Sequence, residues 1–401
     1  MKIAGHQVDD AMFSYIARNL DADTCKLLLK SEPLLSFDKS FAILQIECRR
    51  KCRTKIPELL KNDHFLFPKS ISAEQCTHEV VAQFHASQFM PDDSVLDMTM
   101  GLGVDDYYIA RRVKSLTTIE LDPEIADTGK HNFSFLATNV KVLNDDSVDY
   151  LKRLGSDERY DAIFIDPARR GESGKRLYGF ADCQPDLLSI LPAISRHCSR
   201  LFVKASPMLD VTQSMRELGE CLTDVWAVSV KNECKELFFK LNFEEKATSV
   251  NLHALNYDGE WRQFSTQDVS SASTSPITNL YEAHYLYEPN ASIMKLGCPS
   301  AVEQAFGTPQ IAPNSHLMVS DALIADFPGR QFLIKEIIPF KDKEIKNLGK
   351  RIKQANIATR NFKLGAEALK KRLRMHDGGS TYIFATTLPI GEQVLIICEK
   401  S

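Results

Sequence analysis

Acidic residues and glycines follow short apolar runs, at points where strands are expected to end. The run VLDMTMGLGVDDYYIA places Asp97, Thr99, Gly101 and Gly103 in the turn between a buried strand and a helix. Glycines there let the backbone approach a ligand closely, and the helix start offers free N–H groups. Asp106 stands where a third glycine would complete a GxGxxG pattern. The turn therefore predicts a ligand without pyrophosphate, whose ammonium group an acid such as Asp97 attracts. A purely structural turn is the alternative.

The next two strand ends also carry acids. Glu120 lies about 20 residues beyond the glycine turn, where a carboxylate can accept both hydroxyl hydrogens of a ribose. Asp145 and Asp146 follow the third strand, and either could accept a hydrogen bond from an adenine amino group. Either could equally cap the next helix, with Ser147 as a rival cap. These acids indicate a nucleoside ligand.

The fourth strand ends in FIDPARRGESGKR. Asp166 follows four apolar residues there, so we expect it at the mouth of the sheet, beside the ligand, where chemistry would occur. The loop 169–176 carries four Lys or Arg residues with Glu172 as its counter-charge. A basic loop beside a reactive acid suits a phosphate-bearing substrate. A solvated surface loop is the alternative.

The elements that must position these residues alternate along the chain. Apolar runs at 94–99, 115–121, 140–145, 160–166 and 200–206 are separated by helical patterns such as 184–197. Such alternation predicts βαβ units and a mainly parallel sheet. The last two runs, 224–231 and 235–242, are joined by too few residues for a parallel crossover, so we expect an antiparallel hairpin. This layout predicts an α/β, Rossmann-like fold that differs from the all-parallel sheet of a nicotinamide-binding domain.

The flanking regions have other patterns. Residues 1–69 are expected to be helical, since Phe41, Leu44, Cys48 and Cys52 recur at helical spacing. Residues 72–90 are expected to form one more helix, opened by Ser72 with Gln75 as in a capping box. We find no chemistry in residues 1–65, which could form a substrate-binding cap or be structural.

The C-terminal part begins with a change of composition. The stretch 266–276 is rich in Ser and Thr and predicts a linker. A strand at 330–340, helices at 341–354 and 363–375, and two final strands then predict a small α+β unit.

One segment of this unit is strongly basic. Residues 341–374 hold twelve Lys or Arg residues and three acids, a net charge of +9 in a chain whose formal net charge is −4. A basic helical module on an acidic body suggests a docking face for a polyanion. The alternative is a solvated helix face, because Lys and Arg are good helix formers.

Composition sets the outer limits. The chain has 401 residues, 44% of them hydrophobic, enough for two or three domains. It shows neither an apolar run long enough to cross a membrane nor a signal peptide, so we expect a cytoplasmic protein without a membrane partner. Its ten cysteines are scattered without a CxxC pair, which favours apolar fillers in a reducing compartment over a metal site or disulfides. The oligomeric state stays open.

Together the motifs at 97–103, Glu120, 145–146 and 166–169 resemble those of the class I S-adenosylmethionine-dependent methyltransferases, over about residues 70–243. The resemblance implies their seven-stranded sheet, S-adenosyl-L-methionine as cofactor, and a set of cofactor-binding residues: Asp97, Thr99, Gly101, Gly103, Glu120, Asp145 and Asp146. It also implies that Asp166 orients or deprotonates the methyl acceptor and that Arg169 positions the substrate.

Over its full length the chain is similar to bacterial proteins in which such a domain is followed by a ferredoxin-like piece and a THUMP-like domain. This similarity implies a helical region at 1–69, a methyltransferase domain at 70–245, a small α+β domain at 246–328 and a basic THUMP-like domain at 329–401. Because THUMP domains bind RNA, it also implies tRNA or rRNA as the substrate, contacted by residues 341–374 and the loop 169–176.

The reaction itself stays open. Methyltransferases of exocyclic amino groups usually carry Asp/Asn-Pro-Pro-aromatic, whose ring stacks on the flipped base, whereas here Ala168 and Arg169 stand in place of the second proline and the aromatic residue. Arginine can stack on a base or hold a phosphate. The acceptor atom could therefore be nitrogen, carbon or oxygen.

Ribose 2′-O-methyltransferases carry a Lys-Asp-Lys-Glu arrangement. Lys69, Asp166, Lys204 and Glu236 are loosely similar to it. A lysine of depressed pKa could take a hydroxyl proton; a structural Lys204–Glu236 pair is the alternative.

Two other classes of function are rivals. The unusual Asp-Pro-Ala-Arg and the basic C-terminal module would suit a non-catalytic RNA-binding protein on a methyltransferase scaffold. A nicotinamide-dependent oxidoreductase is disfavoured by the incomplete glycine pattern and by the terminal hairpin.

Overall fold

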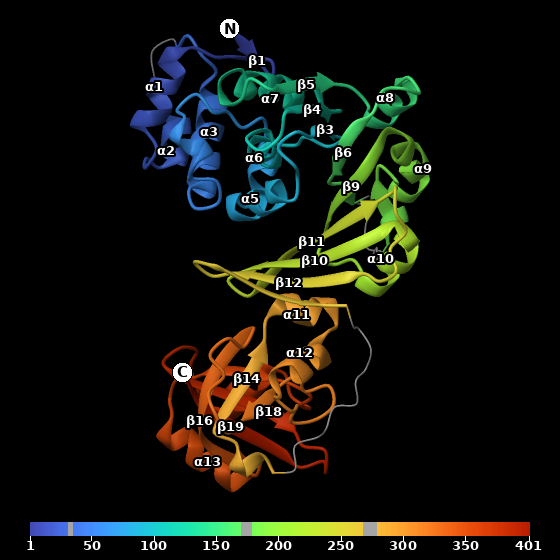
Figure 1. Cartoon of the computed structure of the whole chain (residues 1–401). Coiled ribbons are helices and arrows are strands. Elements are labelled where there is room, and N and C mark those ends of the chain that lie inside the picture. The colour runs from blue at the N-terminus through green and yellow to red at the C-terminus, as the bar shows by residue number, and fades with distance from the viewer. Residues whose placement is uncertain (31–34, 170–178, 268–278) are drawn as a thin grey trace. The chain divides into compact units, whose positions relative to one another are not determined.

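A computed structural model describes residues 1–30, 35–169, 179–267 and 279–401. The chain divides into two compact units (Figure 1). The first unit comprises residues 1–224 and 237–248, and the second unit comprises residues 225–236 and 249–401. Among the described residues, no helix is both long and apolar enough to cross a membrane.

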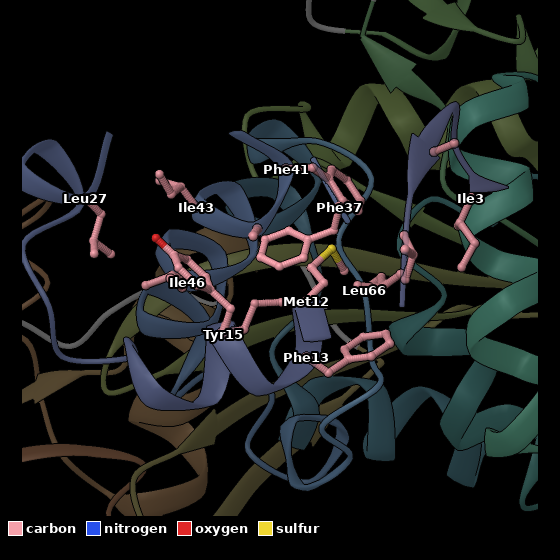
Figure 2. Packing of buried hydrophobic residues seen from close by; sticks show 14 residues of the cluster. Ile3, Met12, Phe13, Tyr15, Leu27, Phe37, Phe41, Ile43, Ile46 and Leu66 are labelled. Atoms are coloured by element: carbon pink, nitrogen blue, oxygen red, sulfur yellow. The ribbon is translucent and has the colours of Figure 1, made fainter. Parts of the chain in front are cut away.

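The N-terminal region forms a small helical body within the first unit. Its elements are β1 (Lys2–Ile3), β2 (His6–Gln7), α1 (Asp10–Arg18), α2 (Thr24–Leu29), α3 (Lys39–Cys52) and the 3-10 helix η1 (Leu59–Lys61). Asp9, Asp23 and Asp38 cap the three α-helices by accepting backbone N–H groups. Figure 2 shows apolar side chains of α1 and α3, among them Met12 and Phe41, gathered into one buried cluster.

Polar contacts hold this helical body together and attach it to α7 of the first unit. The Arg49 guanidinium donates to the backbone carbonyl oxygens of Asp63 at 2.7 Å and Phe65 at 2.8 Å. The Asn132 side chain on helix α7 (Pro123–Leu136) both donates to and accepts from the backbone of Leu66. These contacts fit the structural role that the sequence left open for residues 1–65.

The segment 72–90 was expected to be one helix, and that prediction is wrong. The structure has α4 (Ser70–Gln75) and α5 (Glu79–Ser87), separated by a break at residues 76–78. The helix does not start at Ser72, and no side-chain cap forms at α4. Cys76 has extended backbone angles that end α4, and His78 caps α5 by accepting from the N–H of Val80. The break places Thr77 between the two helices.

The large sheet has nine strands in the order β13-β12-β10-β11-β9-β6-β3-β4-β5. Its central strands are β3 (Ser94–Asp97), β4 (Ser115–Glu120), β5 (Val140–Asn144), β6 (Tyr160–Ile165), β9 (Cys198–Ala205), β10 (Leu222–Val230) and β11 (Glu233–Asn242). Strands β5, β4, β3, β6 and β9 run parallel, and β11 is antiparallel to β9. This arrangement confirms the predicted α/β sheet with an antiparallel end. The carboxyl ends of its parallel strands share one edge.

The connections of the parallel strands carry the other helices of the first unit. These are α6 (Val104–Ala110), α7, α8 (Ser147–Arg153), α9 (Leu187–His197) and α10 (Val211–Leu218), with the 3-10 helices η2 (Phe180–Asp182) and η3 (Gly219–Cys221). A short antiparallel pair, β7 (Ala168–Arg169) and β8 (Cys183–Gln184), follows β6.

The sheet is larger than the seven strands expected. Strands β12 (Asn251–Tyr257) and β13 (Trp261–Thr266) form an antiparallel hairpin that continues it beyond β10. We had expected residues from 246 onward to begin a separate small domain. Pairing with β12 satisfies the backbone groups of β10, which would otherwise be an edge strand, and this explains the extension.

The rest of the second unit holds a six-stranded sheet in the order β15-β14-β16-β19-β18-β17. Its strands are β14 (Tyr285–Pro289), β15 (Met318–Ser320), β16 (Gly329–Pro339), β17 (Asn356–Thr359), β18 (Thr381–Thr387) and β19 (Gln393–Lys400). Its helices are η4 (Leu280–Glu282), α11 (Ala291–Leu296), α12 (Pro299–Phe306), α13 (Asp342–Arg351) and α14 (Ala366–Leu373). The predicted strand at 330–340 and the two predicted basic helices are confirmed as β16, α13 and α14.

Candidate active site

The glycine turn and the end of β6 are joined by hydrogen bonds at the carboxyl edge of the sheet. The Asp97 carboxylate accepts from the backbone N–H of Thr99 at 2.7 Å. The Thr99 hydroxyl oxygen accepts from the backbone N–H of Asp166, also at 2.7 Å. Thr99 therefore fixes the position of Asp166 relative to the glycine turn.

The glycine turn also contacts the end of β4. The backbone N–H of Gly101 donates to Glu120 Oε2 at 3.0 Å, and the N–H of Asp122 donates to Oε1 at 2.8 Å. Gly101 has a φ of +57°, and no atom lies within 4 Å of the position that its Cβ would take. The turn is thus open above Gly101 and backed by a half-buried carboxylate.

Gly103 is needed for a different reason. It has a φ of +78°, and a Cβ there would lie 2.8 Å from Cε2 of Phe133 on α7. Only glycine fits both the left-handed backbone and this close approach.

A buried pair of carboxyl groups lies beneath the turn. Asp97 is 1% exposed and Asp106 is fully buried. Burial raises the pKa of Asp97 to about 7, and burial together with the charge of Asp97 raises the pKa of Asp106 well above its usual range. We infer that the pair holds a proton at neutral pH. Thr118 on β4 donates to Asp106 Oδ2 at 2.9 Å and fixes its orientation.

The Lys204 ammonium group, near the end of β9, lies close to oxygens of Asp166, Thr77 and Asp105. Its Nζ is 2.5 Å from Asp166 Oδ2, 3.0 Å from the Thr77 hydroxyl oxygen and 3.7 Å from Asp105 Oδ2. The Lys204 side chain is only 11% exposed, whereas that of Asp166 is 39% exposed. Two carboxylates at these distances favour the charged amine, so Lys204 acts here as a hydrogen-bond donor.

Asp105 is held from its other side by His85. Its Oδ1 lies 2.8 Å from His85 Nδ1, and its Oδ2 accepts from the Thr77 hydroxyl. Burial opposes the charge of Asp105, but the charge of Lys204 and the bond to His85 prevail and lower its pKa to about 2. The His85 ring is fully buried and stacks on Phe238 of β11, with 4.4 Å between ring centroids.

Comparisons with known proteins give this geometry a context. A THUMP domain-like family matches residues 329–400, and a ferredoxin-like domain family matches residues 285–328. The crystal structure of a candidate methyltransferase from Porphyromonas gingivalis W83 is similar over 98% of both chains, with a TM-score of 0.87 and 29% sequence identity. The 23S rRNA (uracil(1939)-C(5))-methyltransferase of Photobacterium angustum is 27% identical over 170 residues, which are 40% of this chain and 71% of that protein. An uncharacterized RNA methyltransferase of Mycoplasma mobile is 32% identical over 81 residues, 20% of this chain and 22% of that protein.

The chain is a methyltransferase with a C-terminal THUMP-like domain. The structural similarity spans both units, and the sequence relatives are named as methyltransferases.

In this methyltransferase, Asp145 and Asp146 have partners within the protein. Asp146 is the N-cap of α8 and accepts from the N–H of Val148 at 2.8 Å and of Asp149 at 3.0 Å. Ser147, considered as a rival cap, is the first residue of the helix. Asp145 forms an ion pair with Arg153. The capping contact is present at Asp146, and an adenine contact by Asp145 or Asp146 stays a prediction.

Of the four residues of the Lys-Asp-Lys-Glu comparison, one pair is seen in contact, and Lys69 has other partners. Lys204 and Asp166 are in direct contact. Lys69 instead forms ion pairs at the end of β4, with Asp122 at 2.5 Å and Glu124 at 3.1 Å. Glu236 is buried on β11 and belongs to the second unit.

Arg169 and its loop are described only in part. The backbone of Arg169 forms β7 and pairs with Cys183 of β8. Residues 170–176, the rest of the predicted basic loop, lie outside the described residues. A substrate-positioning role for Arg169 stays a prediction.

Three residues at or near Lys204 were not predicted from sequence: Thr77, His85 and Asp105. Asp105 belongs to the same motif as Asp97, but only its neighbour Asp106 was interpreted, because it stands where a third glycine would complete the GxGxxG pattern. Thr77 and His85 lie in the segment 72–90, which we expected to be one continuous helix. No periodicity brings residues 77 and 204 together, so only the folded arrangement reveals this cluster.

Proposed function

We propose that this methyltransferase transfers the methyl group of S-adenosyl-L-methionine to RNA, with Asp166 at the reaction centre. One observation carries the proposal. Asp166 is bonded through its backbone to Thr99 of the glycine turn and through its carboxylate to Lys204. The Asp166 carboxylate therefore lies between the predicted cofactor turn and the Lys204 ammonium group.

The residues at the turn fit the proposed cofactor. Gly101 leaves open space where a side chain would stand, and Glu120 offers a half-buried carboxylate for two ribose hydroxyls. Leu121, next to it, is 62% exposed and could cover an adenine ring. When bound, S-adenosyl-L-methionine supplies a methyl group already activated by its sulfonium.

Asp97 and Gly103 would support the turn from below. Asp97 accepts from Thr99 and is almost fully buried beside Asp106. We propose that Asp97 acts mainly by fixing the turn. The proton that it shares with Asp106 would reduce the negative charge of the pair beneath the turn. Gly103 would let the turn pack against Phe133.

Asp166 would act on the methyl acceptor. Lys204 occupies its Oδ2, and within the described parts of the chain Oδ1 accepts no hydrogen bond. Oδ1 could therefore accept the hydrogen of an N–H or O–H group and take its proton as the methyl group is transferred. Lys204 would hold the carboxylate in this orientation throughout, which is the positioning on which such a reaction depends.

Several findings support RNA as the substrate. Two sequence relatives are named as RNA methyltransferases, and residues 329–400 match a THUMP domain-like family. On α13, on α14 and at the C-cap of α14, some exposed cations form no ion pair with a carboxylate of the described residues: Lys343, Lys346, Lys350, Lys371 and Arg374. Such cations are available for phosphate contacts.

Methylation of a ribose 2′-hydroxyl is the second candidate. The 2.5 Å contact between Lys204 and Asp166 favours it, because an acid–lysine pair suits deprotonation of a hydroxyl. The position of Lys69 beside Asp122 does not support it.

Mass spectrometry of modified nucleosides tests the proposal. RNA from cells lacking the gene should lack one methylated nucleoside, and the wild-type gene should restore it. A gene carrying Asp166→Asn should not. The chemical identity of that nucleoside distinguishes base from ribose methylation. Identical nucleoside profiles with and without the gene would contradict RNA methylation.

A further inference from the structure

We infer that Thr77 and Asp105 are positioning residues, which hold the Lys204 ammonium against Asp166. The inference rests on the proposed function, because the position of Lys204 matters for catalysis only if Asp166 acts on the methyl acceptor. It assigns a role to the break between α4 and α5, which the cofactor turn does not explain.

The directions of the hydrogen bonds define the arrangement. Lys204 has only donors, so the Thr77 hydroxyl oxygen accepts from it at 3.0 Å. The same hydroxyl has one hydrogen, which it donates to Asp105 Oδ2. A single threonine therefore links a buried carboxylate to the ammonium.

The distances show why the hydroxyl is needed. Asp105 Oδ2 lies 3.7 Å from Lys204 Nζ, beyond the usual limit of about 3.2 Å for a hydrogen bond. Asp105 attracts the ammonium by its charge, but a charge at that distance does not fix a direction. The contacts to Thr77 and to Asp166 are short enough to be directed hydrogen bonds of Lys204.

Asp105 is itself held in place, so that it can orient the Thr77 hydroxyl. His85 contacts its other oxygen at 2.8 Å, and the His85 ring is held against Phe238. Asp105 is the second residue of α6, just after the glycine turn, whereas Thr77 and His85 come from the segment before β3. Supporting residues of this kind set the orientation of the group that they contact.

Thr77→Val is the direct test, because it replaces the hydroxyl with a methyl group of similar size. Thr128→Val is a matched control: Thr128 is 1% exposed, and its hydroxyl donates only to the Glu124 carbonyl within α7. Thr77→Ser keeps a hydroxyl and should restore the wild-type behaviour.

The first readout does not depend on activity. The full-length protein is treated with an amine-acetylating ester, and acetylation of Lys204 is followed by peptide mass spectrometry. Thr77→Val should increase the rate at Lys204 about fivefold, the effect of one lost hydrogen bond. Lys69, paired with Asp122, serves as the internal reference. An unchanged rate at Lys204 would overturn the inference.

The second readout is methyl transfer from S-adenosylmethionine to total RNA of cells lacking the gene. Thr77→Val should lower kcat about tenfold or more, while the Kd for S-adenosylhomocysteine stays at the wild-type value. Equal kcat in Thr77→Val and Thr128→Val, or no rescue by Thr77→Ser, would overturn the inference.

The two proposals fail in different ways. If the wild-type protein transfers no methyl group to RNA, the proposed function fails and the acetylation of Lys204 alone decides the inference. If Thr77→Val does not fold, Thr77→Ala removes the same hydroxyl and the same two readouts apply.

Discussion

The candidate site alternates acidic and basic groups over a short distance. Lys204 lies in space between Asp166 and Asp105. The side chains of Lys204 and Asp105 are only 11% and 13% exposed. Each charge in such a row depends on its neighbours, because a buried charge without a partner is strongly destabilising. The residues that would do the chemistry are therefore also expected to matter for folding.

Removal of the Lys204 charge should destabilise the protein. Lys204→Met would leave the largely buried Asp105 without a nearby lysine, with the Thr77 hydroxyl and His85 still in contact, at a cost of about 3 kcal/mol in the free energy of unfolding. Lys69→Met is the control, since Lys69 and Asp122 are each more than a third exposed and such pairs contribute under about 1 kcal/mol. Urea denaturation measures both. Equal losses in the two variants would contradict this account of Lys204.

The Asp97–Asp106 pair predicts a pH dependence. Unfolded, both acids release their protons near pH 4, whereas burial raises the pKa of Asp97 to about 7 in the folded protein and that of Asp106 also rises. The folded state then binds more protons than the unfolded state between pH 4 and 7. The free energy of unfolding from this pair should thus fall as the pH rises, by at most about 1.4 kcal/mol per pH unit for each proton.

Asp106→Asn should flatten this dependence, because it removes one acid and the repulsion between the two. Urea denaturation at pH 5, 6 and 7 gives the slope for each protein. A slope as steep as that of the wild type would show that the pair holds no extra proton.

At the scale of elements, the positions of the parallel strands along the chain and the acids at their ends could be predicted from sequence. Apolar runs of strand length and the short link between the last two strands carry that information. The break at 76–78 could not be predicted, because helical spacing continues across it. Thr77 is placed there by contacts to Asp105 and Lys204, which are distant in the sequence. The pairing of the hairpin β12–β13 with β10 could not be predicted for a similar reason, since it is a long-range contact.

The two glycines of the turn should respond differently to alanine. Gly103→Ala brings a Cβ to 2.8 Å from the Phe133 ring in a left-handed backbone, which we expect to cost about 2 kcal/mol or more. Gly101→Ala meets no atom within 4 Å and should cost only about 1 kcal/mol. It should nonetheless weaken binding of S-adenosylhomocysteine, because its Cβ would enter the open space of the turn.

Thermal unfolding and isothermal titration calorimetry separate these two effects. Full cofactor affinity in a well-folded Gly101→Ala variant would remove this turn from the proposed cofactor site.

At the scale of the whole molecule, we propose that one unit carries out methyl transfer and that the other contributes to RNA binding. The first unit holds the candidate site, and the second unit carries the basic helices α13 and α14. The formal net charge of the whole chain, −4, gives no sign of a basic segment. The count of charged residues over 341–374, a net +9, does. Sequence could predict that basic segment and its helices, but not which of its cations are paired with carboxylates.

Unpaired cations on α13 should contribute to RNA affinity. Replacing Lys343, Lys346 and Lys350 with Ser should weaken binding to total RNA and reduce the salt dependence of log K by up to about 0.7–0.9 per lost phosphate contact. Lys152→Ser and Lys246→Ser in the first unit, both exposed and paired with acids, are the control. Filter binding at several salt concentrations measures both. An unchanged slope in the triple variant would exclude α13 from the RNA interface.

Methyl transfer in vitro tests the central claim most directly. Purified protein is incubated with tritiated S-adenosylmethionine and total RNA from cells lacking the gene, and label in RNA is counted for the wild type and for Asp166→Asn. We predict labelled RNA with the wild type and a rate lower by about a hundredfold or more with Asp166→Asn, at equal affinity for S-adenosylhomocysteine. Unlabelled RNA with the wild type, or equal rates for the two proteins, would contradict the account.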